Sequence, residues 1–223
     1  MSGLLFQGSP RCQPPTLVVT PGFRPRVRLA RPRLMDAPRR IGFLVFPRLT
    51  LLDLIGVHDA LRRLAPMGIA PAVRLTIIGT EASIADESGL GIIPDQVYGD
   101  LAPLDLLVVP GGFGTRPLLG DARCIDYLRG WGDRRPVASV CTGSLLLGKA
   151  GYLAGLRATT HHGSFDLLRP FCREVVTDAR VVDEGRVVTA AGVTSAIDLG
   201  LHLVGRFWGD EARRRIAAQM EYR

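Results

Sequence analysis

Four short segments with the pattern of strands, separated by segments with a helical pattern, constrain the fold of this chain more than any other feature. The segments are Ile41–Phe46, Val73–Gly79, Asp105–Pro110 and Val137–Val140. The first is a continuous apolar run, which is typical of a strand that is buried on both faces of a sheet. Strands that alternate with helices form parallel βαβ units, so the pattern predicts an α/β fold with a doubly wound, mostly parallel sheet flanked by helices.

The segments between and after these strands predict the remaining elements of a single domain over residues 41–223. Helices are expected at Leu51–Leu64, Asp121–Trp131, Thr142–Lys149, Ser164–Leu168, Val193–Trp208 and Glu211–Glu221. Further strands are expected at Ala158–His161, Val175–Thr177 and Arg180–Val188, the last with a turn at residues 183–185, and short strands or a hairpin at Ser83–Gln96.

Residues 1–40 differ in composition from the rest of the chain. They contain eight arginines against the single acid Asp36, and 7 of the 16 prolines. Proline lacks an amide donor and restricts the residue before it, so regular structure is hard to form here. We therefore predict an Arg- and Pro-rich, disordered N-terminal extension, with Met35 as an alternative start of the native protein.

The net charge of +7 lies entirely in this extension, because residues 41–223 hold twenty basic and twenty acidic residues. The domain has no net charge to attract nucleic acid, so we expect no nucleic-acid partner. No apolar run reaches the roughly 18–20 residues of a membrane-spanning helix, and no membrane association is expected. The four cysteines show neither zinc-site nor disulfide-scaffold spacing, which predicts no metal and favours the reducing cytoplasm as the compartment.

Chemically distinctive residues follow three of the predicted strands. Asp53 comes after the first strand, Gly111 and Gly112 come after the third, and Cys141 comes after the fourth. Ligands of open parallel sheets bind outside the carboxyl ends of the strands. The three segments are therefore expected to converge on one site.

Cys141 stands where a strand of small and β-branched residues runs into a helix without a loop, in the segment Ser139–Ser144. This pattern is typical of a nucleophile elbow, a strained turn that holds a reactive side chain above the sheet. The N-terminus of the following helix is expected to stabilise the thiolate and to lower its pKa. The alternative is a cysteine that serves only as a small, buried apolar side chain.

Asp53 lies among apolar neighbours, where an unpaired carboxylate is costly to bury. One interpretation is a carboxyl group held against Cys141, with one proton shared between the two acids and available for general acid–base catalysis. The other interpretation is a helix N-cap, a position that favours aspartate.

The glycine-rich segment 110–115 lacks the pattern of a phosphate-binding loop. One interpretation is an ordinary turn. The other, given equal weight, is a backbone that closely approaches a ligand, with the amides of Gly112, Phe113 and Thr142 forming an oxyanion-type pocket. Farther along, His161 or His162 is a candidate to orient or deprotonate the thiol. Neighbouring side chains on a strand face opposite ways, so only one of them is expected to reach the site.

Together these residues resemble the ThiJ/PfpI family, part of the class I glutamine amidotransferase-like superfamily, over residues 41–222. The segments that carry the resemblance are Leu52–Gly56, Val109–Gly112, Ser139–Ser144, Arg157–His161 and Gln219–Tyr222. Within the family they are most similar to the isonitrile hydratases. The resemblance implies a flavodoxin-like fold, a homodimer, and hydration of a small-molecule isonitrile to an N-substituted formamide without a cofactor.

The resemblance also implies roles for individual residues. Cys141 would attack the isonitrile carbon to form a thioimidate that water resolves, Asp53 would carry the protons, and Thr142 would stand beside the nucleophile. The residues expected to contact the substrate are Gly111, Gly112, Phe113, Ile55 and His161.

Three positions depart from the hydratase pattern. Ile55 and Val57 replace a threonine and a proline, and His162 replaces an aromatic residue, so a changed pocket and a changed substrate are expected. Thr142 stands where protease-like relatives carry histidine, which argues against that branch. Two other functions stay open: a small-molecule sensor or stress-protective protein, and glyoxalase-like hydration of small carbonyls. The same domain occurs fused to DNA-binding regulators, but a chain that ends soon after Tyr222 is not expected to carry a DNA-binding domain.

Overall fold

The structure, a computed structural model, describes residues 37–223, and the predicted extension lies outside these residues except for its last four positions. The first strand, β1 (Arg40–Val45), begins one residue before the predicted domain boundary. The amides of Arg39 and Arg40 both donate to the carboxylate of Asp105, at 2.8 and 2.9 Å. The beginning of β1 is thereby tied to the residue that precedes the strand beside it.

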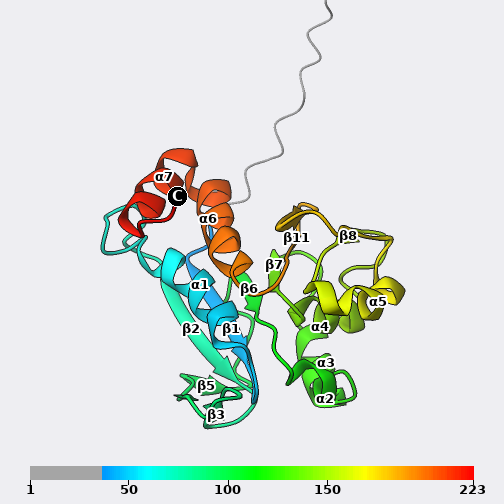
Figure 1. Cartoon of the computed structure of the whole chain (residues 1–223). Helices are drawn as coiled ribbons and strands as arrows, with labels where there is room; N and C mark the ends of the chain where they lie inside the picture. Colours follow the sequence, from blue (N-terminus) through cyan, green and yellow to red (C-terminus); the bar gives the residue numbers. More distant parts are fainter. Residues whose placement is uncertain (1–36) are drawn as a thin grey trace, which may run out of the picture. The chain divides into compact units, whose positions relative to one another are not determined.

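A seven-stranded sheet forms the centre of the domain, as the strand-like segments predict (Figure 1). Its strands lie in the order β10-β11-β7-β6-β1-β2-β5, and all neighbouring pairs are parallel except β10 with β11. The strands after β1 are β2 (Arg74–Gly79), β5 (Gln96–Val97), β6 (Leu106–Val109), β7 (Val137–Val140), β10 (Val181–Asp183) and β11 (Val187–Ala190). Every residue of β6, β7 and β11 is buried, which confirms that these strands are covered on both faces. The strand order reverses at β1, because the chain adds β2 on one side of it and later β6 on the other.

Two groups of helices cover the sheet (Figure 1). One group contains α1 (Leu51–Arg62), α6 (Ser195–Trp208) and α7 (Asp210–Gln219), and the other contains α2 (Thr115–Leu118), α3 (Ala122–Arg129), α4 (Gly143–Ala150) and α5 (Phe165–Leu168). A Cβ atom on Gly56 would lie 2.7 Å from the Cβ atom of Ala196, so α1 and α6 pack closely because this position is glycine. None of the described helices combines the length and the apolar character needed to cross a membrane.

The short elements agree with the predictions in part. The expected hairpin is present as the antiparallel pair β3 (Ile84–Ala85) and β4 (Gly91–Ile92), whereas β5 joins the main sheet instead. The turn at residues 183–185 is confirmed, with Gly185 at φ 81° and its amide bonded to Oδ1 of Asp183. The four-residue helix α2 had no helical pattern in the sequence, and Pro117 lies within it.

The strand predicted at Ala158–His161 is wrong after its first residue. Strand β8 (Arg157–Ala158) pairs with β9 (Glu174–Val175) in a separate two-stranded parallel sheet. The chain then leaves the strand, because the Thr159 amide donates to Oγ1 of Thr189 at 2.9 Å rather than to a strand partner. Two 3₁₀ turns, η1 (His162–Ser164) and η2 (Arg169–Phe171), flank α5.

Candidate active site

The carboxyl ends of β1, β6 and β7 meet, as the three distinctive segments predict. The Gly111 amide donates to Oδ2 of Asp53 at 3.0 Å, which joins the residue after β6 to the first turn of α1. The Gly112 amide donates to Oγ1 of Thr142 at 2.9 Å, which joins the same segment to the residue after Cys141. The site therefore lies where the strand order reverses, the expected location for a ligand of an open parallel sheet.

The backbone at Cys141 has the strained conformation of a nucleophile elbow. Its φ of 54° lies in the left-handed region, which residues other than glycine seldom adopt. Hydrogen bonds to its carbonyl from the side chains of Thr160, at 2.8 Å, and Ser144, at 3.0 Å, hold this turn. A Cβ atom on Gly143 would lie 2.2 Å from the Val109 carbonyl oxygen, so the turn also requires a glycine at that position.

The glycine segment packs directly against the elbow. A Cβ atom on Gly111 would lie 2.5 Å from the Thr142 nitrogen and 2.8 Å from the Cys141 Cβ atom. The Gly112 amide is engaged by the Thr142 hydroxyl, which in turn donates to the Gly112 carbonyl at 3.0 Å. The prediction that the Gly112 amide serves an oxyanion pocket is therefore wrong, because its proton already has a partner within the protein.

Asp53 is fully buried and does not cap a helix. It is the third residue of α1, whose N-cap is Thr50, so the N-cap interpretation of Asp53 is wrong. Burial raises the pKa of Asp53 to about 7, while the Gly111 amide and the Cys141 side chain lower it by less. Its Oδ1 atom is buried without a well-formed hydrogen bond to any described group, although the Cys141 thiol is close enough to act on the carboxyl pKa. A carboxyl group in this state can exchange a proton near neutral pH.

The thiol of Cys141 has a raised pKa, so the prediction of a lowered one is wrong. Burial, followed by the charge of Asp53, raises the pKa of Cys141 to about 12, and the Thr142 amide opposes this only in part. Cys141 is only 5% exposed. The two acids are coupled, and from about pH 7 upward the pair holds one proton, on sulfur. Any attack by this thiol therefore needs a neighbouring base, and Asp53 is in place to act as one.

A cavity of about 350 Å³ opens onto Cys141. It is lined by Thr50, Gly112, Phe113, Arg116, Cys141, Thr142, His161, Gly163 and Val193. Its volume lies near the lower end of the roughly 300–1,000 Å³ that small-molecule sites occupy. Two other residues that were expected to contact the substrate do not line this cavity. Gly111 packs against the elbow, and Ile55 is 45% exposed on α1.

Four of the lining residues did not follow from the sequence: Thr50, Arg116, Gly163 and Val193. Arg116 is the most distinctive of them, because its guanidinium lies 4.9 Å from the centroid of the Phe113 ring. It is carried by α2, a helix without a sequence pattern of its own. The one signal available was its position four residues after Gly112 in the glycine-rich segment.

His161 is a neutral imidazole at the wall of the cavity. Its Nδ1 accepts a hydrogen bond from the Gly163 amide at 3.1 Å, which leaves the ring proton on Nε2. Burial, His162 and Arg116 all lower the pKa of His161. The rings of His161 and His162 stack with their centroids 4.3 Å apart. The premise of opposite orientations on a strand is therefore wrong, because these residues follow β8, but His161 alone of the two lines this cavity, as expected.

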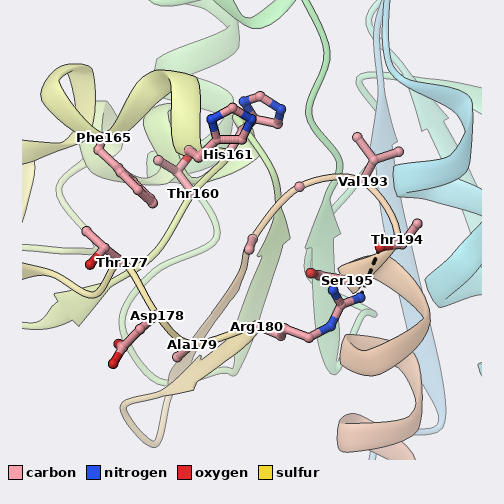
Figure 2. A pocket seen from close by; sticks show the side chains of 13 residues that line it. Thr160, His161, Phe165, Thr177, Asp178, Ala179, Arg180, Val193, Thr194 and Ser195 are labelled. Atoms are coloured by element: carbon pink, nitrogen blue, oxygen red, sulfur yellow. Dashed lines mark hydrogen bonds between the residues drawn. The ribbon is translucent and has the colours of Figure 1, made fainter.

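A second cavity, of about 330 Å³, lies beside the first and shares His161 and Val193 with it (Figure 2). Figure 2 shows His161 and Phe165 on one side of it and the start of α6 on the other. Arg180 in this cavity donates to Oγ1 of Thr194 at 3.0 Å and is paired with Asp198. Within residues 37–223, no three His, Cys, Asp or Glu side chains gather closely enough to bind a metal ion.

This fold and site define a flavodoxin-like α/β protein with a buried cysteine–carboxyl pair at the carboxyl edge of its sheet. The chain belongs to the DJ-1/PfpI family, whose sequence profile matches residues 39–206. The family predicted from the sequence is thereby confirmed.

Two relatives and one solved structure indicate where the chain stands within the family. Isonitrile hydratase from Pseudomonas putida is 38% identical over 185 residues, which cover 82% of this chain and 78% of that protein. The crystal structure of a ThiJ/PfpI family protein from Pseudomonas syringae matches with a TM-score of 0.73 and 31% identity, over 92% of this chain and 82% of that one. The HTH-type transcriptional regulator GbdR from Pseudomonas aeruginosa is 28% identical over 83% of this chain. This chain spans only about half of that regulator (51%).

Proposed function

We propose that this protein hydrates a small isonitrile to the corresponding N-substituted formamide, with Cys141 as the nucleophile and Asp53 as the proton carrier. The observation that carries the proposal is the buried pair itself. A carboxyl group with a pKa of about 7 lies next to a thiol with a pKa of about 12, at the inner wall of a small cavity. The similarity to the isonitrile hydratase of Pseudomonas putida supports the choice of reaction.

The first half of the reaction forms a carbon–sulfur bond. The Asp53 carboxylate accepts the proton of the Cys141 thiol as sulfur attacks the terminal carbon of R–N≡C. The protonated carboxyl group then gives that proton to the same carbon, which yields the thioimidate R–N=CH–S–Cys141. The proton that leaves sulfur thus ends on carbon, and no oxidant, reductant or cofactor is needed.

The second half releases the product. Water adds to the thioimidate carbon, with its hydroxyl group on carbon and a proton on nitrogen, to give R–NH–CH(OH)–S–Cys141. The carbon–sulfur bond then breaks, the hydroxyl proton passes to sulfur through Asp53, and R–NH–CHO leaves the site. Asp53 accepts and returns a proton in both halves, a role that suits a carboxyl group with a pKa near neutral.

Other residues of the site position this pair in the proposed mechanism. The Thr142 amide and side chain act directly on the Cys141 thiol and lower its pKa. Thr142 is itself fixed by the exchange of hydrogen bonds with Gly112. The Nε2 proton of neutral His161 is available at the cavity wall for the nitrogen atom of the thioimidate intermediate.

The test is a direct assay of turnover. Purified protein is incubated with cyclohexyl isocyanide, and N-cyclohexylformamide is quantified by gas chromatography. We expect product from the wild type and none above the uncatalysed background from Cys141→Ser, which preserves the shape of the elbow. Absence of product from a folded wild-type protein, with a panel of aliphatic, aromatic and carboxylate-bearing isonitriles, would remove this function.

A second candidate function is ligand sensing without chemistry. It is favoured by the similarity to the regulator GbdR over 83% of this chain. Calorimetric titration with small amines, carbonyls and isonitriles separates the two functions. Tight binding without conversion would support the sensor, and conversion would support the hydratase.

Two further expectations from the sequence belong to this proposal: a homodimer and a cytoplasmic location. Leu52 and Ile55, three residues apart on α1, are 40% and 45% exposed, which supports burial of that helix face against a second copy. The cysteines described by the structure are free thiols, as suits a reducing compartment. Light scattering that gives the mass of one chain would contradict the dimer.

A further inference from the structure

An arginine side chain that has no carboxylate partner among residues 37–223 lies in the wall of the Cys141 cavity. The guanidinium of Arg116 donates long hydrogen bonds to the Gly112 carbonyl, at 3.3 Å, and to Oγ of Ser164, at 3.4 Å. No Asp or Glu within residues 37–223 lies within ion-pair distance of it. The neighbouring Arg48 differs in this respect, because it pairs with Glu87 at 3.0 Å.

The position of Arg116 is defined by the cavity wall itself. Its guanidinium stacks on the Phe113 ring with 4.9 Å between the carbon of the guanidinium and the ring centroid. Phe113 and Arg116 both line the cavity, together with Cys141. A stacked guanidinium keeps its planar set of donors in a fixed orientation, which suits two-point binding of a carboxylate.

The charges around the cavity leave this cation unbalanced. The residues that line it include no aspartate or glutamate. His161 is neutral, and Arg116 itself is one cause of its lowered pKa. The nearest acid to the nucleophile, Asp53, is fully buried behind the lining and is engaged with Gly111. A ligand in the cavity therefore meets a thiol at the inner wall and a guanidinium that forms no ion pair with any residue of 37–223.

We propose that Arg116 binds a carboxylate of the substrate, so that isocyano acids are the preferred substrates over neutral isonitriles. The assignment of an isonitrile as the reacting group rests on the proposed function. The assignment of the carboxylate site rests only on the position of Arg116. The small volume of the cavity, about 350 Å³, brings both sites within the reach of one small molecule. Because Arg116 is exposed at the cavity mouth, water and salt screen its attraction for the carboxylate in part.

Two alkylating reagents test the anion site without any isonitrile. Iodoacetate and iodoacetamide transfer similar groups to a thiolate and release the same iodide, but only the former carries a carboxylate. The rate of modification of Cys141 by each is measured by peptide mapping, and the ratio of the two rates is compared between variants. We expect this ratio to fall about fivefold in Arg116→Gln. A change of this size corresponds to the loss of one charge-assisted hydrogen bond that solvent partly screens.

Two further variants serve as controls. Arg116→Lys keeps the charge and is expected to keep most of the preference for iodoacetate. Arg48→Gln removes an equal charge 6.0 Å from the same Phe113 ring but outside the cavity lining, and is expected to leave the ratio unchanged. An unchanged ratio in Arg116→Gln, or an equal fall in Arg48→Gln, would overturn the anion site.

Substrate kinetics test the substrate class. The pair is isocyanoacetate and its methyl ester, which differ in the charge of the carboxyl group. In Arg116→Gln we expect KM for isocyanoacetate to rise about fivefold and KM for the ester to change by less than about twofold. Equal effects on both would overturn the assignment while leaving the hydratase function intact. If the ratio of the two alkylation rates depends on Arg116 but neither isocyanoacetate nor its ester is converted, the anion site is retained and the hydratase function is removed.

Discussion

The amide of Gly111 donates a hydrogen bond of 3.0 Å to Oδ2 of Asp53, and this contact joins the end of β6 to the first turn of α1 beside the Cys141 elbow. It occupies one oxygen of a carboxyl group that is otherwise sealed from water. The second oxygen, Oδ1, has no well-formed hydrogen bond to any group within residues 37–223. The carboxyl group is thus held in one orientation, with one oxygen free to receive the proton that the neighbouring thiol must lose.

The raised pKa of Asp53 predicts how stability depends on pH. The folded pKa, about 7, lies above the usual value of 3.8, so the folded state binds the proton more tightly than the unfolded chain does. This contribution to stability is complete below about pH 4 and is lost as the pH rises to 7, amounting to about 4 kcal/mol. Asp53→Asn does not titrate and can still accept the Gly111 bond. We expect its stability relative to the wild type to increase between pH 4 and pH 7, as measured by urea denaturation.

That expectation has a clear contrary result. A difference in unfolding free energy between Asp53→Asn and the wild type that stays constant over this pH range would show that Asp53 titrates normally in the folded state. A difference that decreases with rising pH would mean that the folded pKa of Asp53 is lowered, as it would be beside a positive charge. The structure shows no such charge next to Asp53 within residues 37–223.

The same substitution should make the thiol easier to ionise. The charge of Asp53 is one of the causes that raise the pKa of Cys141, and asparagine removes that charge. The pKa of Cys141 should then fall while burial still keeps it above the usual value. We expect iodoacetamide at pH 8.5 to modify Cys141 faster in Asp53→Asn than in the wild type, with Cys172 as an internal reference in the same peptide map. At pH 8.5 solvent hydroxide can take the thiol proton before alkylation, so slower modification would mean that the charge of Asp53 does not raise the pKa of Cys141.

The dependence of turnover on pH follows from which member of the pair holds the proton. The proposed attack needs Asp53 ionised and Cys141 protonated, a state that becomes dominant above the pKa of about 7. We therefore expect kcat/KM for an isonitrile to rise about tenfold per pH unit below this value and to level off above it. An acid limb near pH 4 would indicate a carboxyl group with an ordinary pKa, and a decline above pH 7 would indicate the opposite protonation state.

The elbow should not tolerate a side chain at Gly143. A Cβ atom there would lie 2.2 Å from the Val109 carbonyl oxygen and 2.6 Å from that of Pro110, and both are backbone atoms that cannot rotate away. We expect Gly143→Ala to lose several kcal/mol of unfolding free energy, within the range of overpacked or strained sites of about 1–3 kcal/mol or more. Gly120→Ala is the matched control, because its Cβ atom would meet only the Pro117 carbonyl oxygen, at an ordinary 3.6 Å. Equal unfolding temperatures for both variants would refute the packing argument.

The parts of the fold that could be predicted are those whose signal is local. The buried strands follow from short, mainly apolar segments, and the elbow at Cys141 follows from a strand that meets a helix without a loop. The convergence of Asp53, Gly111 and Cys141 followed from one rule about parallel sheets. Strand β8 could not be delimited, because two residues carry no periodicity and its partner β9 is remote in sequence.

The errors at the site have a common physical origin in contacts between distant segments. The pKa of Cys141 depends on burial and on the approach of Asp53, neither of which is visible in the residues around Cys141. The residues around Gly112 give no sign that its amide has a hydrogen-bond partner. In the structure, Oγ1 of Thr142, 30 positions away, accepts a hydrogen bond from that amide. Arg116 reaches the cavity only because α2 places it there.

The most direct test of the account is the rate of isonitrile hydration by Asp53→Asn compared with the wild type, measured as formamide produced under saturating substrate. Asparagine can keep the Gly111 bond and the buried volume, but it cannot carry a proton between sulfur and carbon. The account predicts a loss of about 10²–10⁴-fold in kcat with a folded protein, and partial activity for Asp53→Glu, which keeps the proton but displaces it. Asp53→Asn that turns over at nearly the wild-type rate would contradict the claim that the Asp53–Cys141 pair performs the reaction.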